Sequence, residues 1–201
     1  MQKSSLYIDM GDYKATMACY EKQLEMCLEL GYKRGRFLAI GNIGYVYYDN
    51  GDYEAAMACY DKAIAGHREI GYKFGLTYWL EGKARCLFTQ KYFSEAKKCA
   101  DECIELSTEV SKRDMLFASN VLLAKINWAL GHQAQALEQL IEMLTNAKEK
   151  SDVAALNYEL WHMEEGEGKL ERGTHALKLY QELYEQTPKF EYQQRIEVLS
   201  R

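Results

Sequence analysis

The sequence predicts an all-α fold, a right-handed superhelix (α-solenoid) of about five helix-turn-helix repeats with a C-terminal capping helix. Three observations predict it: blocks of sequence return at a constant interval, glycines fall at the expected turns, and the 201 residues contain one proline. Proline removes a helical hydrogen bond, so its scarcity favours long helices. A single helical hairpin cannot bury its apolar face alone, so hairpins that recur at a constant interval are expected to stack.

Whole blocks of sequence define the repeat interval. Gly11-Asp12-Tyr13 returns 40 residues later as Gly51-Asp52-Tyr53, and Met17-Ala18-Cys19-Tyr20 returns at the same interval as Met57-Ala58-Cys59-Tyr60. The interval predicts one domain over residues 1–201, with repeats at approximately 1–31 (truncated), 32–71, 72–111, 112–151 and 152–188 and a cap at 189–201. Because most of the first helix is missing, we expect either a fragment of a longer protein or a stub of a helix.

The second repeat shows how each hairpin is expected to form. Its first helix, helix A, is predicted over residues 33–49 and ends at Asn50-Gly51, since both residues tolerate the left-handed conformation that ends helices. Asp52 is expected to cap helix B by accepting backbone N–H bonds. Helix B then continues to about Ile70, where Gly71 ends it in the same manner. The turns that correspond to Gly51 are expected at Gly11, Lys91 and Gly131, and in the last repeat somewhere within 166–173.

The second repeat also carries the residues of a known family. Its pattern of small and aromatic residues resembles the tetratricopeptide repeat, at Gly44, Tyr47, Gly51, Tyr53, Ala56, Tyr60 and Ala63. The length of the interval is similar to that of a subgroup that includes Pins-type polarity scaffolds, kinesin light chains and bacterial signalling proteins. The resemblance implies a protein-interaction scaffold. We expect Gly44 and Ala56 to lie where the two helices approach most closely.

Composition excludes several other classes of protein. The net charge is −5 with both signs mixed along the chain, whereas nucleic-acid binding needs clustered Lys and Arg. No long apolar run or secretory signal appears, so we expect neither membrane association nor secretion. Cys19, Cys59 and Cys99 recur at the repeat interval, too far apart on stacked helices for disulfides. Reduced thiols predict a cytoplasmic location.

The candidate binding surface lies on the A helices, which are expected to line a concave groove. One face of each helix follows a 3-4-3 spacing, which places side chains in a line. The predicted groove residues are Tyr45, Tyr48, Tyr78, Glu81, Arg85, Phe88, Lys125, Trp128, Tyr158 and Trp161. Aromatic residues and Arg dominate interface energetics, so we expect this groove to bind a peptide or helix. The alternative is that some of these aromatics pack between neighbouring A helices.

The chemistry of the groove favours an acidic partner. Arg85 and Lys125 are suited to an acidic peptide or a C-terminal carboxylate through charge-assisted hydrogen bonds. The leading hypothesis is therefore a scaffold within a larger signalling or regulatory protein. The alternative is a regulatory module that senses a ligand or peptide and changes its superhelical pitch. Apolar surface near Leu6 and Tyr7 would also allow a homodimer.

The residues that could suggest an enzyme are better explained by structural roles. Cys99 and Cys103 have i,i+4 spacing, yet no histidine or second cysteine pair lies at zinc-site spacing nearby. The four histidines are scattered, and the glycines fall at repeat turns instead of forming a phosphate-binding loop. We therefore predict no enzymatic activity, no metal site and no cofactor.

Overall fold

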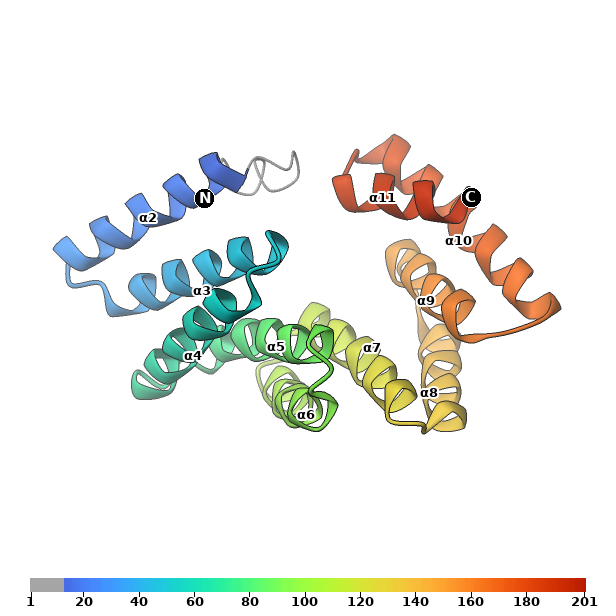
Figure 1. Cartoon of the computed structure of the whole chain (residues 1–201), viewed down its shortest axis with the longest axis horizontal. Helices are drawn as coiled ribbons and strands as arrows, with labels where there is room; N and C mark the ends of the chain where they lie inside the picture. The colour runs from blue at the N-terminus through green and yellow to red at the C-terminus, as the bar shows by residue number, and fades with distance from the viewer. Residues whose placement is uncertain (1–12) are drawn as a thin grey trace. The chain divides into compact units, whose positions relative to one another are not determined.

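The computed structural model describes residues 13–201 (Figure 1). The first turn predicted at Gly11-Asp12 and the apolar surface predicted near Leu6 and Tyr7 lie outside these residues. The chain divides into two compact units, Met1–Leu130 (unit 1) and Gly131–Arg201 (unit 2). Over the described residues the chain is an all-α repeat solenoid, and these residues contain helices and no strand. None of the helices in this range is long and apolar enough to cross a membrane.

Unit 1 consists of helices of equal length joined by links of equal length. Within residues 13–130 six helices each have 17 residues, and three residues separate each from the next: α2 Tyr13–Glu29, α3 Lys33–Asp49, α4 Tyr53–Glu69, α5 Lys73–Thr89, α6 Phe93–Glu109 and α7 Arg113–Ala129. One helix and its link together take half of the predicted repeat interval, so a hairpin of two helices and two links takes one full repeat. The bounds predicted for the first helix of the second repeat are confirmed by α3.

Each link closes in the same way. Its middle residue has positive φ, from 53° at Ser111 to 81° at Gly51. Glycine adopts this conformation without a Cβ clash, whereas Lys91 and Ser111 adopt it with a side chain. The next N–H bonds back to a helical carbonyl, as in Tyr72 N to His67 O at 2.9 Å, which satisfies the end of the helix. The predicted cap is also confirmed, because Asp52 accepts a hydrogen bond from Ala55 N.

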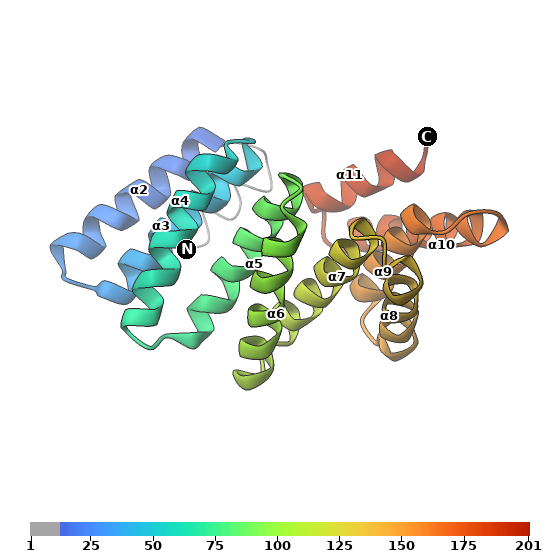
Figure 2. The ribbon, with the colours of Figure 1, turned by 60° about the horizontal axis from the view of Figure 1, so that its bottom comes forward.

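Consecutive helices of unit 1 pack in pairs, as Figure 2 shows, and α3, α5 and α7 (the A helices) also contact one another in sequence. Contacts between successive A helices are more extensive than those between successive B helices, α2, α4 and α6. Small residues allow the close approach within hairpins. A Cβ on Gly44 would lie 3.0 Å from Cβ of Cys59, and Ala56 is fully buried, as predicted.

The core of unit 1 is centred on Trp79 of α5. Its indole is 3% exposed, stacks on Tyr60 and His67 of α4, and donates a hydrogen bond to Nδ1 of His67 at 2.9 Å. Gly41 of α3 leaves room for the other side of the ring, because a Cβ there would lie 2.4 Å from Cε2 of Trp79. One aromatic side chain therefore links three consecutive helices.

Unit 2 contains less regular helices. They are α8 Gln133–Asn146, α9 Lys150–Met163, α10 Glu167–Gln186 and α11 Phe190–Leu199. The turn predicted within 166–173 begins earlier, at Glu164, and ends at Gly166, whose φ is 75°. The helix predicted after Pro188 is confirmed, and α11 packs Ile196 and Leu199 against the Tyr158 and Tyr180 cluster.

Candidate functional site

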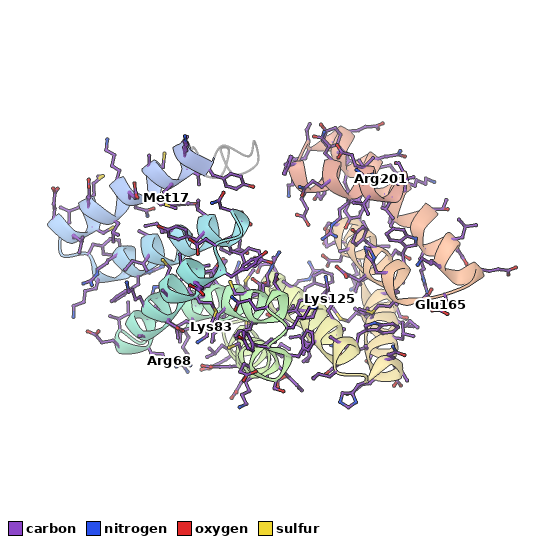
Figure 3. All side chains as sticks on the ribbon, viewed as in Figure 1. Met17, Arg68, Lys83, Lys125, Glu165 and Arg201 are labelled. Carbon is purple, nitrogen blue, oxygen red and sulfur yellow. The ribbon has the colours of Figure 1, made fainter. Side chains whose placement is uncertain are left out.

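The predicted site residues divide between the two units. Eight of them lie on three consecutive A helices of unit 1 and are called the A-face below: Tyr45 and Tyr48 on α3, Tyr78, Glu81, Arg85 and Phe88 on α5, and Lys125 and Trp128 on α7. Tyr158 and Trp161 lie on α9 in unit 2. The side chains of the described residues, including the labelled Lys125 of α7, are drawn in Figure 3.

Arg85 links the α3 and α5 parts of the A-face. Its guanidinium carbon lies 5.3 Å from the ring centre of Tyr48 on α3, and its Nη1 lies 3.7 Å from Oε1 of Glu81, one turn earlier on α5. The Arg85 side chain is 44% exposed, whereas that of Glu81 is 5% exposed. The cation therefore reaches the surface while its own carboxylate partner stays buried beneath it.

The charges around Arg85 support one another. Burial opposes the charge of Arg85, but Glu81 and then Tyr45 and Tyr48 raise its pKa well above the ordinary arginine value. Burial raises the pKa of Glu81, and Arg85 opposes that shift. The Glu81 charge and then burial raise the pKa of Tyr45. Arg85 is therefore a permanent cation, and Tyr45 keeps its hydroxyl proton and can donate it in a hydrogen bond.

A second cation, one repeat later, also lies near an aromatic ring of the preceding A helix. Lys125 Nζ of α7 lies 6.0 Å from the ring centre of Phe88 on α5. Tyr48 and Phe88 also pack against the first aromatic of the following helix, with ring centres 5.6 Å from Tyr53 and 5.7 Å from Phe93. Each ring thus packs within its hairpin and also faces a cation of the next A helix. Trp128 is half-buried on α7.

The residues in unit 2 have a different environment. Tyr158 is 6% exposed and belongs to the unit 2 core, where Arg195 of α11 lies 4.0 Å from its ring centre. Trp161 is half-buried, with Lys169 Nζ 5.7 Å from its ring centre. The structure therefore brings Arg85 together with Tyr48 and Glu81, and Lys125 together with Phe88, while Tyr158 and Trp161 form contacts within unit 2. A surface hollow of about 610 Å³ lies along α10 and is lined by none of the predicted residues.

Lys112 is a cation near the A-face that the sequence prediction missed. It lies in the link before α7, 5.1 Å from the ring centre of Phe74 and 5.4 Å from that of Tyr78, and it pairs with Asp114 at 2.7 Å. The sequence could have indicated where Lys112 lies, because it stands one repeat after Tyr72 of the repeated Gly-Tyr-Lys turn. The predicted groove was drawn from helix positions, which leave out the links.

The cysteines are packed inside the helices. All six are free of disulfides, and no group of three or more metal-ligating side chains occurs within residues 13–201. Cys103 is fully buried, donates to the Thr77 carbonyl at 3.0 Å and accepts from Ser119 Oγ at 3.0 Å. Burial raises the pKa of Cys103, and it raises that of Cys86 to about 12. These contacts support the core role that the sequence favoured for Cys103.

Comparison with known families and structures finds similarity to tetratricopeptide repeats. Models of the tetratricopeptide repeat match residues 1–29 and 38–70. The chain is similar to the nearly identical tetratricopeptide-like repeats of a candidate kinesin light chain from Podosopora anserina, with a TM-score of 0.60 and 13% sequence identity. The match covers 99% of this chain and 92% of the kinesin light chain structure. The apo form of RapI has a TM-score of 0.74 and 14% identity, with 99% of this chain covered. The chain spans 62% of the RapI chain. No curated protein sequence matches.

Proposed function

We propose that this chain is a tetratricopeptide-repeat scaffold without enzymatic activity, and that its A-face binds a peptide or helix of a partner protein. The matches of the repeat models to residues 1–29 and 38–70 support this proposal. Arg85 carries the proposal. It is an exposed cation beside the aromatic rings of Tyr45 and Tyr48, and arginine and aromatic residues are the types that dominate binding interfaces.

The packing of unit 1 supports a binding surface on this side. The A helices contact one another more extensively than the B helices do. The more closely packed layer of a curved stack lies on its inner side, which supports a concave groove on the A-face. An inner surface contacts an extended ligand from several repeats at once.

The partner is proposed to be acidic. The cations of Arg85 and Lys125 both lie over aromatic rings of the A-face, and a carboxylate would add a charge-assisted hydrogen bond to either. We also propose a cytoplasmic protein that serves signalling or regulation. The six free cysteines support a reducing compartment.

Selection from a random peptide library tests the proposal. Peptides selected on the full chain are expected to bind the Arg85→Glu/Trp128→Ala double variant at least about tenfold more weakly than the wild type. Lys83→Gln is the matched control, because Lys83 lies on the same helix but pairs with Asp61 of α4 at 2.5 Å. Circular dichroism checks that both variants are folded. Selected peptides that bind the double variant and the wild type equally well would place the binding surface elsewhere.

A further inference from the structure

Arg85 and Lys125 form two matching sites, one repeat apart. Each cation stands at the same sequence separation from the aromatic residue whose ring it faces, Tyr48 for Arg85 and Phe88 for Lys125. Both cations therefore occupy the same position on neighbouring A helices, α5 and α7, which are in contact. Packed helices have axes roughly 8–10 Å apart, so equivalent side chains on α5 and α7 are separated by about that distance.

The two layers of unit 1 differ in charge. The A helices α3, α5 and α7 carry eight Lys and Arg against three Asp and Glu, whereas the B helices α2, α4 and α6 carry six against eleven. Two of the three acids on the A helices are already engaged, Glu81 with Arg85 and Asp114 with Lys112. Three lysines of the A helices pair with acids of the B helices, namely Lys33, Lys73 and Lys83. The A-face itself carries Arg85 and Lys125 against Glu81, so its net charge is positive and it attracts negative charge.

We infer that the A-face takes an extended peptide in the polyproline II conformation with acidic side chains three residues apart, one at Arg85 and the other at Lys125. This inference rests on the proposed function. A polyproline II chain rises about 3.1 Å per residue with three residues per turn, so side chains i and i+3 lie on one side about 9 Å apart. In a β-strand, residues i and i+3 point to opposite faces.

The surroundings of the two cations favour this ligand. Aromatic surfaces are a recurring platform for polyproline II chains, and Tyr48 and Phe88 provide one ring per repeat. A polyproline II backbone has no internal hydrogen bonds, so its backbone groups stay free for contacts with a binding surface. Glu81 offsets part of the Arg85 charge, which favours a singly charged carboxylate over a doubly charged phosphate.

A peptide series with one variable tests the spacing. Twelve-residue proline-rich peptides, each with two glutamates separated by two, three, four or seven positions, are titrated with the full chain by fluorescence anisotropy at low salt. The peptide with a separation of three is expected to bind about fivefold to tenfold more tightly than the others. Arg85→Gln is expected to abolish this preference, whereas Lys83→Gln keeps it.

A charge swap provides the second measurement. Arg85→Glu is expected to prefer, by about fivefold, a peptide in which lysine replaces one glutamate of the pair and the other remains for Lys125. Equal binding of all four spacings, no binding at about 1 mM, or tightest binding at a separation of two, four or seven overturns the inference. If library-selected peptides still depend on Arg85 and Trp128, the proposed function stands without it.

Discussion

Replacement of Gly41 by alanine tests the packing that positions the A-face. Gly41 lies on α3, four residues before Tyr45, and the Cβ of an alanine would lie 2.4 Å from Cε2 of Trp79 and 2.5 Å from its Cδ2. Ordinary carbon contacts need about 3.5–4 Å. The indole cannot move away freely, because it is 3% exposed, stacked on Tyr60 and His67 and hydrogen bonded to His67.

The expected loss of stability follows from two opposing effects. Overpacking a core by one methyl group costs about 1–3 kcal/mol. Alanine in place of glycine within a helix contributes up to about 1 kcal/mol in the other direction. Because the clash involves a ring fixed from several sides, we expect Gly41→Ala to lower the free energy of unfolding by about 1–2 kcal/mol.

Urea unfolding followed by far-ultraviolet circular dichroism measures this loss. The cause is isolated in a Trp79→Leu background, where the clashing ring is absent and Gly41→Ala should be neutral or stabilising. Gly168→Ala is the control, since its Cβ would meet only the end of the Glu164 side chain, at 3.2 Å. If Gly41→Ala retains the wild-type midpoint, or costs as much without the Trp79 ring, the proposed contact between α3 and α5 is wrong.

Two further predictions concern buried titratable groups. Burial lowers the pKa of His67 to about 4, so the unfolded chain binds this proton first, and stability is expected to fall by about 3 kcal/mol as the pH drops from 7 to 4. His67→Gln should remove that part of the pH dependence of the urea midpoint, and an unchanged slope would contradict it. Burial raises the pKa of Cys86 to about 12, so a thiolate-selective reagent at pH 8 should modify it only when urea unfolds the protein. Rapid labelling of Cys86 in the folded chain, mapped by mass spectrometry, would refute this expectation.

The repeat interval made most of unit 1 predictable from sequence. A shift by one repeat assigns every helix of unit 1 once one hairpin is understood, and the predicted bounds 33–49 are those of α3. The link at Lys91 was found by this shift although it has no glycine. The interval fails in unit 2, where α8 and α9 have 14 residues and α10 has 20, so the last turn was placed only within a range.

The composition of the site was also predictable, but its contacts were not. The 3-4-3 spacing placed Arg85 and Glu81 on one helix face, yet it could not reveal that Arg85 reaches across to Tyr48 on another helix. The angle between helices decides such contacts, and packing of large core residues such as Trp79 sets that angle. The same limit explains why Tyr158, which stands at an equivalent repeat position, is buried in the unit 2 core.

The two layers of unit 1 carry opposite net charges, and the exposed ion pairs between them contribute little to stability. Ion pairs do connect the layers, at Lys33 with Glu69, Lys73 with Glu109 and Lys83 with Asp61. These pairs are largely solvent-exposed, and such pairs contribute only about 0–1 kcal/mol each. The charged partner of Arg85 is instead Glu81, one turn away on its own helix. Arg85 therefore compensates a buried carboxylate and contributes to folding, while its side chain, which is 44% exposed, can also be reached from solvent.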